Sequence, residues 1–143
     1  MKAFKFSLQK ILDLRLFAEE QAKLALAAAI SESDRIKNLL KEIAVKRVEA
    51  NKERSVCTDI TGHIAIENYI NRLDIRKEEL LEELASAELV VEEKRAAFNE
   101  AMKQRKVLSN LKDKKYEEYK KQYNKTMEIE LDDMNQARFQ SVE

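Results

Sequence analysis

The sequence predicts an all-α protein: an antiparallel two-helix coiled coil, or helical hairpin, whose second helix is longer than the first and overhangs it. Three observations predict this fold. The 143 residues include one Gly and no Pro, too few for the turns of a sheet or barrel. Charged residues make up 38% of the chain and aromatic residues 6%, a composition typical of long helices. Two long segments carry apolar residues about every 3.5 positions, the spacing of a coiled-coil seam.

The first helix is predicted over about residues 8–55. Steps of three and four residues, taken alternately from position 8 to position 50, find ten apolar residues at thirteen positions. These ten are Leu8, Ile11, Ala18, Ala22, Ala25, Ala29, Ile36, Leu39, Ile43 and Ala50. Ser7 precedes this seam and is predicted to cap the first turn of the helix.

A bend is expected over about residues 56–63, where the single glycine lies among short polar and β-branched residues. A chain reversal near residue 60 makes the two helices antiparallel, so the numbers of facing residues should sum to about 120. This register places Phe4 near Tyr116, where the aromatic rings would seal the end of the hairpin.

The second helix is predicted over about residues 64–138, within a single elongated domain 1–143. From Ile66 to Leu108 the same steps again find ten apolar residues at thirteen positions. About the last 25 residues extend beyond the first helix. There Tyr116, Tyr119 and Tyr123 share one face, which Met127 and Met134 continue. Such a stripe favours a protein contact; the alternatives are packing against residues 1–7 or a homodimer.

Charge and hydropathy exclude several classes of protein. The chain has 27 basic and 27 acidic residues, whereas dedicated nucleic-acid binders are usually basic, so no nucleic-acid partner is expected. The charges are banded: residues 94–125 carry a net +7 and residues 126–143 a net −4. The longest apolar run, from Leu24 to Ile30, is too short to cross a membrane, and no signal peptide is recognisable. The single Cys57 fits a reducing compartment, so a cytoplasmic protein without membrane insertion is expected.

No catalytic, cofactor or metal site is expected. Cys57 and His63 lie six positions apart, but a zinc site needs further ligands and the chain has no other Cys or His. The sequence has no Gly-rich phosphate loop. Its acidic clusters lie on helices that offer no concave site, so they are interpreted as solvated faces. We therefore expect an interaction protein rather than an enzyme.

Three segments resemble the FliJ family of flagellar type III export proteins, and the resemblance covers nearly the whole chain. The first is the N-terminal run Phe4-x-Phe6-x-Leu8-x-x-Ile11-Leu12-Asp-Leu14-Arg15, followed by Glu19-Glu20-Gln-Ala22. The second is Tyr69-Ile70-x-x-Leu73, after the bend. The third is the basic, Tyr-containing tract 108–123, followed by Glu130-Leu131-Asp132-Asp133.

The resemblance implies a coiled coil similar to the stalk of rotary ATPases. It implies binding to the flagellar export ATPase ring, whose assembly and activity the protein would promote. It also implies binding to the cytoplasmic domain of the export gate's large membrane subunit, and escort of export chaperones. The expected location is the cytoplasm, peripheral to the inner-membrane export apparatus. We expect the free protein to be monomeric.

Candidate contact residues follow from these expectations. The ATPase-binding candidates lie at the two chain ends: Phe4, Phe6, Leu8, Ile11, Arg15, Tyr116, Tyr119, Tyr123 and Met127. The export-gate candidates are Tyr69 and Leu73, of which Leu73 also lies on the seam. The alternative function is a generic cytoplasmic coiled-coil scaffold or a prefoldin-like chaperone subunit. The short bend leaves no room for the β-hairpins of prefoldins.

Overall fold

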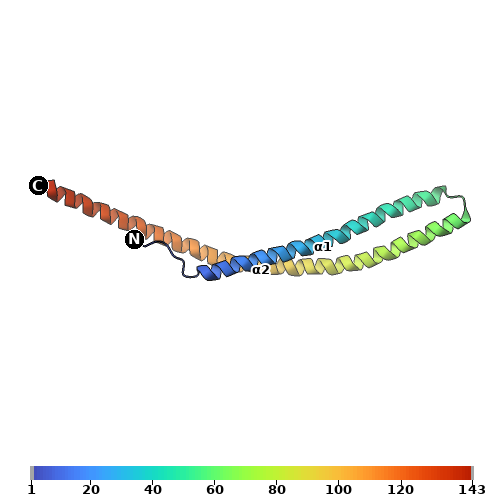
Figure 1. The fold of residues 1–143 in the computed structure, drawn as a ribbon, viewed down its shortest axis with the longest axis horizontal. Helices are drawn as coiled ribbons and strands as arrows, with labels where there is room; N and C mark the ends of the chain where they lie inside the picture. Colours follow the sequence, from blue (N-terminus) through green and yellow to red (C-terminus); the bar gives the residue numbers. More distant parts are fainter. Residues whose placement is uncertain (1, 143) are drawn as a thin grey trace. The chain divides into compact units, whose positions relative to one another are not determined.

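The computed structural model describes residues 2–142, and within them the chain forms two helices and no strand. Helix α1 spans Gln9–Val56 and helix α2 spans Ile60–Val142, which are 48 and 83 residues long. Figure 1 shows the two helices lying side by side from the bend, with the chain running in opposite directions along them. The all-α hairpin with a longer second helix is therefore confirmed.

Packing divides the chain, which the sequence analysis treated as one domain, into two compact units. The bend unit consists of Gln21–Asn99, and the terminal unit consists of Met1–Glu20 together with Glu100–Glu143. Each unit contains part of both helices, so each has its own cross-helix packing.

The bend unit has a core of four apolar side chains, two from each helix. Ile36 and Ile43 of α1 pack with Leu73 and Leu80 of α2, and Leu80 is only 1% exposed. Partly buried residues surround this core: Leu39, Leu40, Leu84 and Ala87. Two helices can bury only one stripe of each against the other, so this seam contributes most of the apolar burial in the unit.

The predicted seam of α2 is confirmed, and so are most apolar positions of the predicted α1 seam; the exceptions are Ile11 and Ala18, which are exposed. In the terminal unit Leu12 is 4% exposed, and its neighbour Ile11 is 44% exposed. In the bend unit the buried residue is Ser33, at 4% exposure, rather than the exposed Glu32 that the predicted spacing selects. The α1 seam therefore has the predicted period, and Ile36 and Ile43 are buried as expected. Between such positions, the buried residue can lie one place later in the chain than predicted, as Leu12 and Ser33 do.

The register across the hairpin is confirmed by two cross-helix ion pairs in the bend unit. Arg47 donates to the Asp74 carboxylate at 3.2 Å, and Arg54 donates to Glu67 at 2.6 Å. The residue numbers of each pair sum to 121, against about 120 expected from the sequence.

The bend is shorter than predicted, because only Cys57, Thr58 and Asp59 lie between the helices. Asp59 caps α2: its Oδ1 accepts from the N–H of Thr61 at 3.3 Å, and its carbonyl accepts from the N–H of His63 at 3.0 Å. The His63 ring, through Nε2, donates to the Cys57 carbonyl at 2.7 Å. Helix α2 therefore begins four residues earlier than the sequence analysis placed it.

Gly62 lies in the first helical turn of α2 rather than in the bend between the helices, and its φ is not positive. A Cβ at this position would lie 2.7 Å from the Sγ of Cys57. The thiol donates to the Asp59 carbonyl at 3.5 Å, so it packs over the helix where only a glycine leaves room. Close approach, rather than a special backbone conformation, explains the only glycine of the chain.

The effect of Gly62→Ala is therefore expected to depend on residue 57. In a Cys57→Ala background the alanine should raise the free energy of unfolding by about 0.5–1 kcal/mol through its helix propensity. In the parent chain the gain should be smaller, since the thiol must leave the Asp59 carbonyl. Urea unfolding followed by circular dichroism measures both values. Equal gains in the two backgrounds would contradict the packing argument.

The ends of the helices also differ slightly from the prediction. The first helical main-chain bond joins the N–H of Leu12 to the carbonyl of Leu8 at 2.9 Å. Leu8 therefore occupies the capping position, and the prediction that Ser7 caps α1 is wrong. Helix α2 continues four residues beyond the predicted end at residue 138.

Candidate functional site

An aromatic cluster joins the N-terminal segment to α2 in the terminal unit. The ring of Phe4 lies edge-on to Tyr116, with ring centres 5.3 Å apart, and tilted against Tyr119 at 5.5 Å. Tyr116 stacks on Tyr119 at 6.4 Å, and Tyr119 contacts Tyr123 at 6.2 Å. The predicted proximity of Phe4 and Tyr116 is confirmed.

The non-helical residues 2–8 are held along α2 by polar as well as aromatic contacts. The Tyr119 hydroxyl donates to the carbonyl of Lys2 at 2.8 Å. Phe6 and Leu8 are half-buried and line a hollow with Leu111 and Tyr119. Tyr116 and Tyr119 thus have partners within the chain, which corrects the expectation that they form a face without one. Packing against residues 1–7, the alternative that the sequence left open, describes these two tyrosines.

A partly buried ion pair joins the two helices of the terminal unit. The Arg105 guanidinium donates to both carboxylate oxygens of Glu19, at 2.5 and 3.2 Å. Their side chains are only 24% and 18% exposed. The hydrogen bond to Glu19 raises the pKa of Arg105 above its ordinary value. Arg15, a candidate contact residue, donates to the side-chain oxygen of Gln104.

Sequence reasoning missed two exposed apolar residues of the terminal unit. Leu14 is 68% exposed and Phe17 is 64% exposed, so both are more exposed than the candidate Ile11, at 44%. They lie three positions apart on α1, away from the buried Leu12. Large apolar residues off the seam were the signal that could have identified them.

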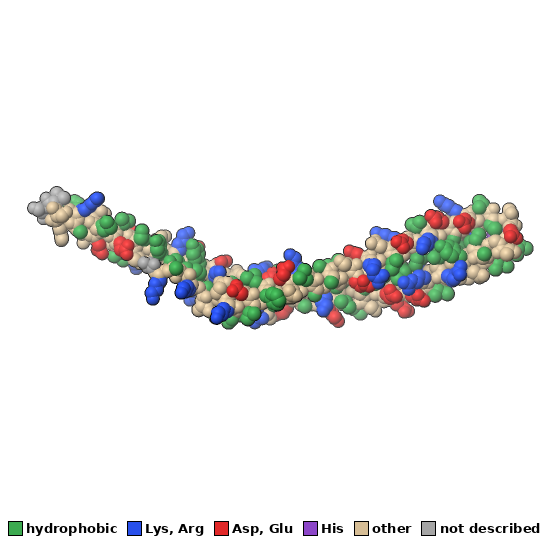
Figure 2. Space-filling model, viewed as in Figure 1, with side chains coloured by type: hydrophobic (Ala, Val, Ile, Leu, Met, Phe, Trp, Pro, Cys, Tyr) green, Lys and Arg blue, Asp and Glu red, His purple; other side chains and the backbone are tan. Residues whose placement is uncertain are grey.

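The C-terminal part of α2, residues 124–142, is referred to here as the overhang. Every side chain from residue 127 to residue 141 is exposed. Figure 2 shows hydrophobic and charged side chains interspersed on this stretch. Met127, a candidate, is 44% exposed, and four further apolar residues are exposed with it: Ile129, Leu131, Met134 and Phe139. Tyr123, at 41%, lies next to the overhang.

The two export-gate candidates differ in their availability for a contact. Tyr69 is 38% exposed, and the guanidinium carbon of Arg72 lies 6.0 Å from the centre of its ring. Leu73 is 8% exposed and belongs to the core of the bend unit. The Tyr69 ring is therefore accessible to a partner, whereas Leu73 holds the two helices together.

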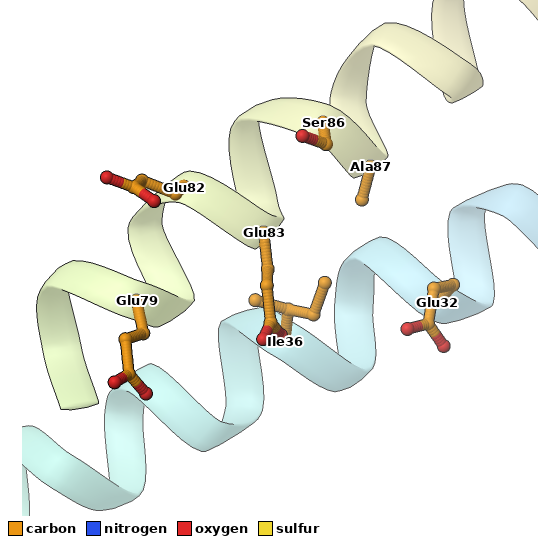
Figure 3. Close-up of a pocket in the computed structure, with 7 residues that line it drawn as sticks. All are labelled: Glu32, Ile36, Glu79, Glu82, Glu83, Ser86 and Ala87. Carbon is orange, nitrogen blue, oxygen red and sulfur yellow. The ribbon is translucent and has the colours of Figure 1, made fainter.

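Four carboxylates surround Ile36 in an open pocket of the bend unit (Figure 3). Glu83 extends toward α1 beside Ile36, whereas Glu82 points away. Arg76 donates to Glu79 at 3.2 Å and lies 3.8 Å from Glu83. The remaining carboxylate, Glu32, accepts from Arg35 at 2.6 Å, and this bond lowers its pKa. Within residues 2–142, no three side chains of the metal-binding types are grouped to hold an ion.

Comparison with known proteins identifies one family. The family model described as flagellar FliJ protein matches residues 4–143, essentially the whole chain. No curated protein and no solved structure matches the chain. In the described part of the chain, neither helix contains a stretch that is apolar and long enough to span a bilayer. The match favours the export family over a generic scaffold.

Proposed function

This chain belongs to the flagellar FliJ protein family, so it is an export-related flagellar component, and from that premise we propose a specific role. We propose that it is a non-enzymatic, stalk-like cytoplasmic protein that binds the ring-forming export ATPase through its terminal unit. Binding favours assembly of the ring and raises its rate of ATP hydrolysis.

The aromatic cluster is the observation that carries this proposal. Through Phe4, Tyr116 and Tyr119 it combines the N-terminal segment and α2 into one surface. The terminal unit also exposes apolar side chains on each helix, such as Ile11 on α1 and Met127 on α2. Exposed apolar side chains on both helices are suited to contact several subunits around the opening of a ring.

The bend unit supplies the second contact of the proposal. Tyr69, exposed near the bend, is proposed to bind the cytoplasmic domain of the export gate's large membrane subunit, with Leu73 supporting its helix from the core. The protein would thereby link the ATPase to the gate at the inner membrane and escort export chaperones there.

The test is the ATP hydrolysis rate of the cognate flagellar export ATPase, titrated with this protein. A saturable rise near stoichiometric ratios supports the proposal. An unchanged rate, with the ATPase shown to form rings in the same buffer, contradicts it.

The double change Phe4→Ala and Phe6→Ala is expected to weaken binding to the ATPase ring about tenfold or more, because buried aromatic anchors dominate interfaces. The helical circular dichroism signal should stay near that of the parent, since both residues precede α1. Leu89→Ala is the control, because it removes an exposed apolar side chain from the bend unit. A collapse of helicity would show that the cluster is structural and refute this contact assignment.

A further inference from the structure

The bend unit carries an apolar groove between its two helices, here termed the bend groove. Its apolar lining consists of Leu40, Ile43, Ala44 and Val48 of α1 and Leu81 of α2. Ile43 is buried at the bottom, whereas Val48 and Leu81 are 54% and 41% exposed. An open apolar groove between two packed helices has the shape that a third amphipathic helix fills.

The charged side chains that line the bend groove are both basic. Arg47 lines it from α1 and Lys77 lines it from α2. Arg47 is paired with Asp74, whereas Lys77 forms no ion pair within residues 2–142. The pocket around Ile36 in the same unit is lined instead by four glutamates (Figure 3). The bend groove, unlike that pocket, therefore suits a helix that carries acidic side chains beside an apolar face.

The overhang carries a face with these properties. Met127, Leu131 and Met134 are spaced by four and three residues, so they lie within about 60° of one line along α2. They are 44%, 55% and 66% exposed. Glu128 and Glu130 adjoin this apolar face, one on each side of it. The face is therefore apolar, open to solvent and edged by carboxylates.

We propose that the overhang of one copy of this chain docks in the bend groove of a second copy. The apolar face of the overhang covers the exposed rim of the groove, and its flanking carboxylates lie beside the basic side chains there. The lengths match: Leu40–Asn51 gives the groove about 16 Å along α1, and Met127–Met134 spans about 10 Å. Leu81 and Met127 belong to one uninterrupted helix, so the overhang cannot lie in the groove of its own chain.

The expected association is weak, because one face of a short helical segment forms each contact. Such a contact buries on the order of 1,000 Å², the low end for specific interfaces, so a dissociation constant on the order of 100 μM is expected. Sedimentation equilibrium from about 10 to about 500 μM should show a mass rising above that of the monomer. A reducing buffer prevents disulfides through Cys57. A monomer throughout would overturn the proposal.

A matched pair of substitutions tests the overhang. Leu131→Asn buries an amide at the centre of the apolar face and should weaken self-association about tenfold or more. Ile129→Asn is the control, because Ile129 is 53% exposed but lies on the opposite face of the same helix. Its association should stay within about twofold of the parent. Equal effects of the two changes would overturn the assignment of this face.

A second pair tests the groove. Ala44→Glu places a carboxylate in the lining of the bend groove and should also weaken self-association about tenfold or more. Val45→Glu introduces the same charge at the next position, outside the groove lining, and should have little effect. Both positions are exposed, so the helical circular dichroism signal should stay that of the parent. An unchanged association of Ala44→Glu would mean that the overhang packs elsewhere, which overturns the proposal.

Mixing the two defective proteins gives the sharpest test. Each variant alone lacks one half of every contact, so both should be monomeric at about 100 μM. A mixture of Ala44→Glu and Leu131→Asn should associate again, because the intact overhang of the first fits the intact groove of the second. A mixture that stays monomeric would overturn the proposal. These experiments use this chain alone, so their failure leaves the proposed ATPase contact untouched.

Discussion

Leu80→Ala is expected to lower the free energy of unfolding of the bend unit by about 2–5 kcal/mol, because it removes a fully buried side chain and leaves a cavity. Leu80 is 1% exposed and packs with Ile36, Ile43 and Leu73. Two helices have few other side chains that can relax into the space, so the upper part of the range is expected. Urea unfolding followed by circular dichroism measures the loss.

The matched control for this change is Leu89→Ala, on the same helix and in the same unit. Leu89 is 68% exposed, so its truncation should change the free energy of unfolding by no more than about 0.5 kcal/mol. Equal losses for the two leucines would mean that the seam of α2 does not carry the stability of the bend unit.

Arg105→Glu is expected to cause the largest loss of order in the terminal unit. It places a second carboxylate beside Glu19, whose side chain is only 18% exposed and loses both of its hydrogen bonds to Arg105. Two like charges in a partly buried position repel each other, which disfavours the packed arrangement of the two helices. Three of the four tyrosines of the chain lie in the aromatic cluster, so their near-ultraviolet circular dichroism reports this loss.

The charge swap provides the control for this prediction. Glu19→Arg combined with Arg105→Glu should restore most of the melting temperature that Arg105→Glu loses. Arg95→Glu, at an exposed pair with Glu92, should have a much smaller effect than Arg105→Glu. Failure of the swap to restore the fold would show that the position, rather than the pair, requires an arginine.

The sequence predicts the seam of α2 more accurately than that of α1, and the difference has a physical cause. In α2 some seam residues stand between polar neighbours, as Leu73 does between Arg72 and Asp74, so only one phase buries them, although Leu80 has an apolar neighbour in Leu81. In α1 several seam positions are doublets, among them Ile11–Leu12 and Leu39–Leu40. Hydrophobicity alone does not choose between the two members of a doublet. Packing against α2 makes that choice.

The candidate site was predictable where it depended on register and not where it depended on local chemistry. The position of the chain reversal was enough to bring Phe4 to Tyr116. The single glycine suggested a turn, whereas the structure uses it to accommodate the Cys57 thiol, a contact that no periodicity reveals. The cap at Asp59 likewise depends on a bend of three residues, shorter than composition indicated.

The short bend also limits how the chain can change in length. Arg47–Asp74 and Arg54–Glu67 keep one register from the bend outward, so a residue deleted from one helix displaces every later partner on the other. A deletion of seven residues preserves the seam only when the facing seven are lost as well. Natural length variants are therefore expected to differ by paired heptads, one in each helix. Residues 127–141, whose side chains are exposed, are free of that constraint within the chain.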